Sequence, residues 1–240
     1  MTGLITGAGR GLGYELVKYG LELGQSIVAT SRVLPETGSE LGKLMMEYPD
    51  RLILLKMDVS SEDEVKKTAG ILTEKNIKLD FIINNAGVLF ESKYDERNPI
   101  EELDIEMLRK TIDVNAVGPA IVLKHLLKFT YGSENPCIIN VTSEGGKLDP
   151  KGYRYSAYCI SKSALNMYSQ KVRNFLSSQD ATKNTRVFYV HPGRMDTVMG
   201  IENAQIHPRE TAVGIYDIIN GSVRIDLDIP FIDYKGRNML

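Results

Sequence analysis

Short apolar runs alternate with longer amphipathic stretches along the whole chain of 240 residues. The apolar runs are rich in Ile and Val, and continuous runs of this length are typical of β-strands covered on both faces. The predicted strands are Gly3–Thr6, Ser26–Thr30, Leu52–Met57, Phe81–Asn84, Cys137–Val141, Arg186–Val190 and Val223–Asp226.

The amphipathic stretches between these runs predict helices. They cover Gly13–Leu23, Gly38–Tyr48, Glu62–Asn76, Asp104–Thr130, Ala157–Ser178 and Pro208–Ile219. Strand and helix therefore alternate, which predicts an α/β fold with a doubly wound parallel sheet and helices on both faces. We expect residues 1–240 to form one domain. Ligands of such sheets bind at the carboxyl ends of the strands, so the residues after each apolar run are the candidates for function.

Composition narrows the class of protein. With 42% hydrophobic and 25% charged residues the chain can bury a large core, and a net charge of −2 gives no sign of a nucleic-acid partner. The two cysteines fit neither a disulfide framework nor metal-ligand spacing, which favours a reducing compartment. We find no 18-residue apolar run and no signal-peptide pattern, so we expect a cytoplasmic protein without a membrane span.

The first predicted strand leads into a glycine-rich turn, TGAGRGLG at residues 6–13, and then into a helix. Gly7, Gly11 and Gly13 allow a tight turn and a close approach of the backbone to a pyrophosphate, and the helix N-terminus behind them offers free N–H groups. The alternative is a loop that merely turns. The strand before it and the helix after it favour a dinucleotide site.

Arginines accompany this turn. Arg10 lies inside it and Arg32 follows the second predicted strand, where proteins that prefer NAD usually carry an acid for the ribose 2′-hydroxyl; Glu36 comes four residues later. Two guanidinium groups can hold a 2′-phosphate. We therefore expect NADP(H) to be preferred, with NAD(H) as the second cofactor. Solvated surface charges are the alternative.

The third and fourth predicted strands also end in candidate binding residues. Asp58 follows the third strand and could accept a hydrogen bond from an adenine amine, or it could cap the next helix, with Ser60 and Ser61 as rival caps. The fourth strand is followed by Asn85 and Ala86-Gly87, which leave room for the backbone to pass close to a flat ligand or simply make a turn.

The fifth predicted strand ends at Ser143, and Tyr158 and Lys162 follow with helical i, i+4 spacing. A nearby ammonium and an oxidised nicotinamide ring would both stabilise the phenolate, and a pKa lowered by two or three units corresponds to about 3–4 kcal/mol. The phenol could then exchange a proton near neutral pH. Tyr14 and Lys18 share the spacing, so the choice of Tyr158 depends on Ser143.

The sixth predicted strand ends in His191-Pro192-Gly193, and Thr197 follows within reach of a phosphate or an amide. We expect His191 to shape a turn, and the three histidines of the chain lack metal-ligand spacing. No GxSxG nucleophile elbow is present, which argues against a serine hydrolase.

Taken together, these motifs resemble the short-chain dehydrogenase/reductase family over nearly the full chain. The matching pieces, in order, are TGAGRGLG (6–13), MDV (57–59), NNAG (84–87), the Asn of DVNAVG (Asn115), INVTS (139–143), YCISK (158–162) and HPGRMDT (191–197). Residues 207–212 and 231–236 resemble the sniffer-like carbonyl reductases and C-factor-like proteins. The resemblance implies one Rossmann domain with a seven-stranded sheet.

The resemblance also implies residue roles. Tyr158 would be the general acid/base, Lys162 would lower its pKa and bind the nicotinamide ribose, Ser143 would orient the substrate oxygen and Asn115 would hold a proton-relaying water. Motifs and resemblance together predict these coenzyme contacts: Gly7, Gly9, Arg10, Gly11, Leu12, Gly13, Arg32, Asp58, Val59, Asn85, Ala86, Gly87, Tyr158, Lys162, Pro192, Gly193 and Thr197.

The predicted function is reduction of an aldehyde or ketone by NADPH. A 3-oxoacyl-[acyl-carrier-protein] reductase or a secondary-alcohol dehydrogenase is the alternative among enzymes, and a non-catalytic NADP(H)-binding signalling protein is the alternative of another class. The substrate pocket is expected near residues 90–95, 143–155 and 194–205. The resemblance implies a homodimer or homotetramer formed through the helices at 104–130 and 157–178, where Val122, Leu126 and Phe129 could face outward or be buried.

Overall fold

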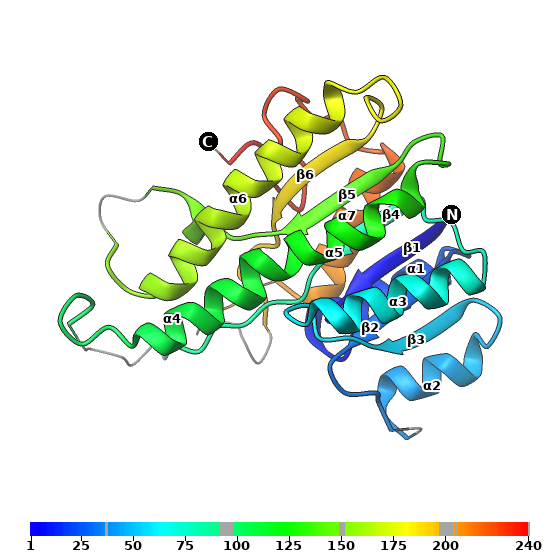
Figure 1. Ribbon diagram of the computed structural model, residues 1–240, viewed down its shortest axis with the longest axis horizontal. Coiled ribbons are helices and arrows are strands. Elements are labelled where there is room, and N and C mark those ends of the chain that lie inside the picture. Colours follow the sequence, from blue (N-terminus) through cyan, green and yellow to red (C-terminus); the bar gives the residue numbers. More distant parts are fainter. Residues whose placement is uncertain (37, 92–97, 149–151, 197–203, 205, 240) are drawn as a thin grey trace.

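Seven parallel strands form one sheet in the computed structural model, which describes residues 1–36, 38–91, 98–148, 152–196, 204 and 206–239 (Figure 1). The strands are β1 (Thr2–Thr6), β2 (Ser26–Ser31), β3 (Leu52–Lys56), β4 (Phe81–Asn84), β5 (Cys137–Val141), β6 (Arg186–His191) and β7 (Phe231–Asp233). Six of the predicted strands are confirmed to within one residue at either end.

The predicted strand at 223–226 is wrong, because that stretch is a loop and the seventh strand comes later. A turn at Asp226 accepts hydrogen bonds from Asp228 and Ile229. Phe231 pairs instead with Tyr189 of β6, and their rings stack with centroids 5.3 Å apart. The edge strand therefore forms where the buried Phe231 can pair with β6, and not at the short apolar run 223–226.

The strand order is β3-β2-β1-β4-β5-β6-β7. The chain builds outward from β1 to β3, then returns to the other side of β1 with β4. The carboxyl ends of β1 and β4 therefore lie side by side at the point where the winding reverses, and doubly wound sheets bind ligands in the crevice at that point.

The helices form a layer on each face of the sheet (Figure 1). The side chains of α1 (Gly11–Glu22), α2 (Glu40–Glu47) and α7 (Pro208–Asn220) share one core cluster with one face. The side chains of α3 (Glu62–Glu74), α5 (Gly118–Leu126) and α6 (Ser156–Ser177) share a second cluster with the other face. The doubly wound prediction is confirmed.

The predicted long helix at 104–130 is present but interrupted. It consists of α4 (Ile105–Ile112), a π-helical turn η1 (Asp113–Val117), α5 and a final 3₁₀ turn η2 (Leu127–Thr130). Asp104 begins it as an N-cap that accepts a hydrogen bond from the Met107 N–H. Val122 and Leu126 are fully buried in the core, so an outward-facing apolar surface built on them is excluded.

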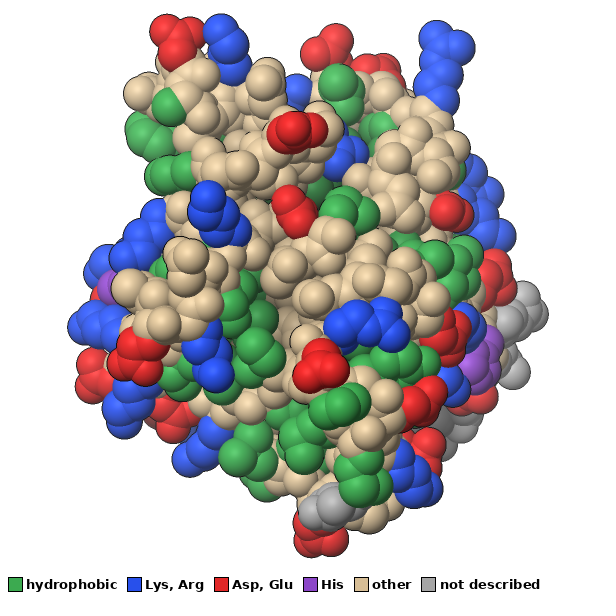
Figure 2. All heavy atoms as spheres, turned by 90° about the vertical axis from the view of Figure 1, so that its right-hand side faces the viewer, with side chains coloured by type: hydrophobic (Ala, Val, Ile, Leu, Met, Phe, Trp, Pro, Cys, Tyr) green, Lys and Arg blue, Asp and Glu red, His purple; other side chains and the backbone are tan. Residues whose placement is uncertain are grey.

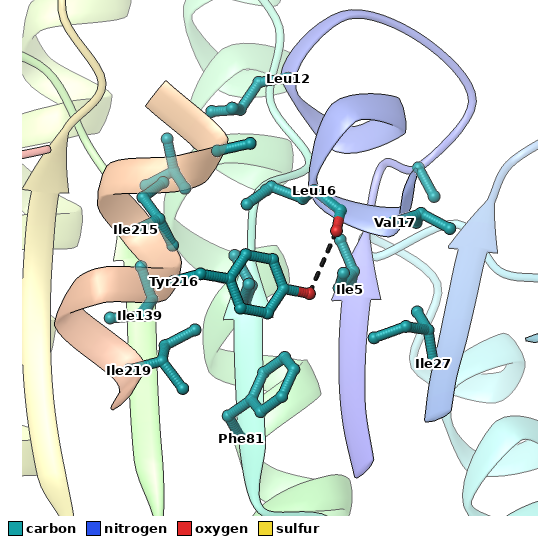
Figure 3. Packing of buried hydrophobic residues seen from close by; sticks show 14 of the residues in the cluster. Ile5, Leu12, Leu16, Val17, Ile27, Phe81, Ile139, Ile215, Tyr216 and Ile219 are labelled. Carbon is teal, nitrogen blue, oxygen red and sulfur yellow. Dashed lines mark hydrogen bonds between the residues drawn. The ribbon is translucent and has the colours of Figure 1, made fainter. Parts of the chain in front are cut away.

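The core between α1 and α7 is packed around Tyr216 (Figure 3). Its ring meets those of Tyr19 and Phe81 edge to face, and its buried hydroxyl donates to the Leu16 carbonyl at 3.1 Å. A Cβ atom at Gly20 would lie 2.1 Å from that hydroxyl oxygen, so only glycine allows this close approach. The packing ties α7 to α1, the helix that follows the glycine turn.

Figure 2 shows one side of the molecule, where Lys and Arg side chains are interspersed with Asp and Glu. No large single-sign region faces the viewer there, which agrees with the near-neutral net charge. Within the described residues, no helix has the length and apolar character needed to cross a membrane.

Candidate active site

The glycine turn joins the end of β1 to α1. Gly7 has a φ of +68°, and a Cβ atom there would lie 2.7 Å from the Ala86 Cα atom. A Cβ atom at Gly13 would lie 2.1 Å from the Gly7 carbonyl oxygen, so α1 packs directly against the turn. Arg10, the N-cap of α1, makes no side-chain cap hydrogen bond, which leaves the helix N–H groups to a ligand. The turn fits a dinucleotide pyrophosphate.

Thr6 and Asn85 lock the turn to the segment after β4. The Thr6 hydroxyl accepts hydrogen bonds from the N–H groups of Asn85 (3.1 Å) and Ala86 (3.0 Å). The Asn85 side chain donates in return to the carbonyls of Thr6 (2.9 Å) and Gly7 (3.2 Å). Asn85 therefore holds the glycine turn in place through its side chain. Thr6 was not among the predicted site residues, and the only signal for it in the sequence is its place directly before the glycines.

Arg10 and Arg32 are both exposed near this turn. Their chain neighbours are close to each other, since a Cβ atom on Gly9 would lie 3.7 Å from the Ser31 Cβ atom. Among the described residues, neither guanidinium group takes part in a hydrogen bond or ion pair with another side chain, and no acidic residue directly follows β2. The arrangement fits a phosphate on the adenosine ribose.

The turn after β3 shows which residue caps the next helix. Ser61 is the N-cap of α3, and its hydroxyl accepts from the Glu64 N–H. Asp58 instead accepts from the N–H (2.9 Å) and the hydroxyl (2.6 Å) of Ser60. Val59 is buried against Gly118. A contact of Asp58 or Val59 with adenine stays a prediction.

Ser143 and Tyr158 meet above the carboxyl end of β5. A short 3₁₀ turn, η3 (Glu144–Gly146), folds back against α6, and the Gly146 carbonyl accepts from the Ser163 hydroxyl at 3.1 Å. A Cβ atom at Gly146 would lie 2.6 Å from the Asn166 side chain and 3.1 Å from the Lys162 carbonyl, so the turn packs closely on α6. The Ser143 hydroxyl accepts from the Gly145 N–H at 3.0 Å. A Cβ atom at Gly145 would lie 3.5 Å from that hydroxyl oxygen and 3.9 Å from the Tyr158 ring, so both side chains face the same place.

The pKa of Tyr158 is raised to about 12, the opposite of the sequence-based expectation. Burial is the largest cause, and the hydrogen bond with Ser143 only partly offsets it. Without a coenzyme the phenol is therefore not acidified. The expectation that Lys162 and an oxidised nicotinamide ring together bring it toward neutrality stays a prediction. A further positive charge close to the phenol is needed to lower its pKa.

Lys162 lies one helical turn beyond Tyr158 and is only 4% exposed. Its ammonium group lies 5.6 Å from the centre of the Tyr158 ring and donates to the Val141 carbonyl at 2.9 Å. Burial lowers its pKa to about 8. A Cβ atom at Gly87 would lie 3.6 Å from the Lys162 nitrogen, so the segment after β4 reaches the same place.

Asn115 lies in the π-helical turn, shortly before Pro119 in the first turn of α5. Its side chain is fully buried and fully engaged: Oδ1 accepts from the Val88 N–H at 2.8 Å, and Nδ2 donates to the Val88 carbonyl (2.9 Å) and the Ser161 hydroxyl (3.0 Å). Asn115 thus connects the segment after β4 to α6, beside Lys162.

His191 links the end of β6 to the Ser143 turn, because its Nδ1 atom accepts from the Glu144 N–H at 3.1 Å. The Glu144 carboxylate pairs with Arg194 at 2.7 Å. The Pro192 carbonyl accepts from the Thr211 hydroxyl of α7, and Gly193 has a φ of +81°. His191 shapes the turn as expected, but the sequence did not indicate its bond to the serine turn.

Part of the predicted site has no structural description. Thr197 lies outside the described residues, as do residues 92–95, 149–151, 197–203 and 205 of the predicted substrate pocket. The described residues bring Ser143, Tyr158, Lys162 and Asn115 together at the carboxyl edge of the sheet, next to the glycine turn.

The seven-stranded doubly wound sheet, the glycine turn and this cluster define a class of oxidoreductase. The short chain dehydrogenase family model matches residues 2–206, and the chain belongs to this family. It is an oxidoreductase that acts on CH–OH or carbonyl groups with a nicotinamide coenzyme.

The individual relatives share only about a quarter of their residues with this chain. A benzil reductase ((S)-benzoin forming) of Bacillus cereus is 28% identical over 216 residues, which cover 87% of this chain and 79% of the relative. The carbonyl reductase Sniffer of D. melanogaster has a TM-score of 0.84 and 26% identity, covering 99% of this chain and 98% of that one. A short-chain dehydrogenase/reductase of Burkholderia multivorans with bound NADP has a TM-score of 0.80 and 25% identity, covering 99% and 98%.

Proposed function

We propose that this protein is an NADPH-dependent reductase that converts an aldehyde or ketone to an alcohol, with Tyr158 as the general acid. One observation carries the proposal. The Ser143 hydroxyl and the Tyr158 ring both lie next to Gly145, with buried Lys162 beside the ring, at the sheet edge where the glycine turn would hold a coenzyme.

The bound coenzyme would supply a hydride to the carbonyl carbon of the substrate. The chain supplies the rest. Tyr158 donates a proton to the carbonyl oxygen, and the Ser143 hydroxyl holds that oxygen by a hydrogen bond. One hydride and one proton added to the carbonyl give the alcohol. A phenol of pKa about 12 holds its proton at neutral pH, which suits reduction.

Lys162 restores the proton to Tyr158 in this proposal. Its pKa of about 8 allows it to give up and regain a proton close to neutral pH. Asn115 would hold the relaying water. Since its side-chain amide is already engaged with Val88 and Ser161, the main-chain carbonyl in the π-helical turn is the group that would do so.

The preference for NADP(H) rests on Arg10 and Arg32, which would hold the ribose 2′-phosphate by charge-assisted bonds. The absence of an acid directly after β2 agrees with this preference. The remaining predicted contacts would come from the glycine turn, Asp58, Val59, Asn85–Gly87 and Pro192–Gly193. NAD(H) would bind more weakly, because it leaves the two arginines without a phosphate.

The test is to mix the purified protein with NADPH and a panel of aldehydes and ketones that includes benzil, the diketone in the name of the Bacillus relative. Loss of reduced-nicotinamide absorbance with a member of the panel is the expected result. A requirement for a carrier-protein substrate would favour the 3-oxoacyl reductase. Tight NADPH binding without oxidation by any substrate would refute catalysis.

We also propose that two copies pair through the surface of α6, where Ile160, Met167 and Phe175 are exposed. These side chains replace the buried Val122 and Leu126 as the apolar surface that a second copy could cover. Light scattering after size exclusion should give the mass of a dimer or tetramer. Met167→Glu should then shift the protein to a monomer.

A further inference from the structure

The N-terminus of α6 carries the catalytic tyrosine but has no cap of its own. The N-cap residue, Tyr155, is in the left-handed conformation (φ 58°, ψ 43°) and its side chain makes no cap hydrogen bond. A helix leaves its first N–H groups without intrahelical partners, and those groups need acceptors. Asp104, by comparison, caps the start of α4 with its own carboxylate.

A carboxylate from a distant segment supplies the missing acceptors. Glu91, in the segment after β4, accepts the Ala157 N–H on Oε1 at 3.0 Å and the Tyr158 N–H on Oε2 at 2.9 Å. Both oxygens are engaged, and the partners are 66 and 67 residues away in the chain. Charge-assisted bonds at the positive end of a helix are stronger than ordinary ones.

One of these two N–H groups belongs to Tyr158 itself. The proposed proton transfer requires the Tyr158 phenol to stay close to Ser143, while Lys162 lies one turn further along α6. First turns of helices fray easily, and a displacement of about 1 Å at a reacting group can reduce the rate by about 100-fold. A fixed first turn is therefore a requirement of the chemistry.

We propose that Glu91 is a positioning residue for catalysis: it clamps the first turn of α6 and thereby holds the Tyr158 phenol in register with Ser143. The segment after β4 is then tied to the site at two points, since Val88 of the same segment is bonded to Asn115. Glu91 does not touch the reacting atoms and acts through the backbone. The proposal rests on the proposed function of Tyr158.

Glu91→Gln and Glu91→Ala test the clamp, with Asp104→Ala as the matched control. Glutamine keeps one acceptor oxygen but replaces the other with an amide NH2 group, which cannot accept a hydrogen bond. It therefore removes half of the clamp at nearly constant volume. Asp104→Ala removes a carboxylate cap from the start of α4, which borders the same small hollow as Glu91. All three variants should lower Tm by a few degrees.

Turnover should separate the variants. We expect Glu91→Gln to lower kcat about 10-fold and Glu91→Ala about 100-fold, with KM and the NADPH Kd within about twofold of wild type. Asp104→Ala should keep wild-type kcat. A wild-type kcat in Glu91→Ala, or an equal loss in Asp104→Ala, would overturn the proposal.

Amide hydrogen exchange gives a readout that does not depend on activity. In the wild type the Ala157 and Tyr158 amides should be protected, unlike most first-turn amides, and Glu91→Ala should speed their exchange at least about 10-fold while the middle of α6 is unchanged. Unprotected amides in the wild type would disprove the clamp even if the enzyme is active. If the amides are protected but no carbonyl compound is reduced, the failure lies with the proposed function.

Discussion

Lys162→Met separates two effects of the buried lysine: its cost to the stability of the fold and its contribution to turnover. The lysine is 4% exposed, and burial alone lowers its pKa from the ordinary 10.5 to about 8. At pH 7 the folded protein therefore holds a charge that burial disfavours, at a cost of about 3 kcal/mol. Methionine has a similar length and no charge, but it leaves the Val141 carbonyl without its donor, which costs about 1–2 kcal/mol. At pH 7 the variant should be more stable by roughly 1–2 kcal/mol.

The sign of this difference depends on pH. The folded pKa of Lys162 lies below the unfolded one, so the unfolded chain binds more protons between pH 8 and 10.5, and wild-type stability gains from this group as pH rises. Between pH 7 and pH 10 the gain in the free energy of unfolding is about 2–3 kcal/mol. The advantage of the variant should thus shrink to about zero or reverse by pH 10.

Urea unfolding of both proteins at pH 7 and pH 10 measures this double difference, in which other titrating groups cancel. A difference that stays constant with pH within about 0.5 kcal/mol would refute the burial argument. Turnover is the second readout. Lys162→Met should lose it, whereas Lys18→Met, in the other Tyr-x-x-x-Lys pair on α1, should keep it.

Three further substitutions test other parts of the site. Tyr158→Phe should lower kcat by about 10²–10⁴ with the NADPH Kd within about twofold in a fluorescence titration, and near-normal turnover would exclude the proton role. Arg32→Asp should raise the KM for NADPH and shift the preference toward NADH, and an unchanged ratio of kcat/KM values would show that Arg32 does not contact the 2′-phosphate. Thr6→Val leaves the N–H groups of Asn85 and Ala86 without their acceptor. The substitution should lower the free energy of unfolding by about 1–3 kcal/mol and weaken NADPH binding. Calorimetry that shows neither effect would contradict the role of Thr6 in holding the glycine turn to the segment after β4.

Local patterns were enough to predict most elements. Buried parallel strands give continuous apolar runs, and amphipathic helices cover them, so the alternation along the chain predicted the sheet and both helical layers. Prediction failed at residues 223–226, where a short apolar run resembled a strand. The pairing of Phe231 with Tyr189 decided the seventh strand, and no local pattern contains that contact.

In the candidate site, too, some residues could be predicted from the sequence and others could not. Residue types and spacing predicted Gly7, Ser143, Tyr158 and Lys162, because phosphate approach and proton transfer need those groups near strand ends. The clamp by Glu91 could not be predicted, since a carboxylate 66 residues from its partners has no local signature.

The sequence by itself determined which chemical groups stand at the ends of the strands, because strand periodicity and strand-end chemistry are local properties. Only the tertiary structure decided their protonation and mutual contacts. Burial raises the pKa of Tyr158 and lowers that of Lys162, against the charge argument drawn from spacing alone. Desolvation depends on every element packed around a group, so it exists only once the chain has folded.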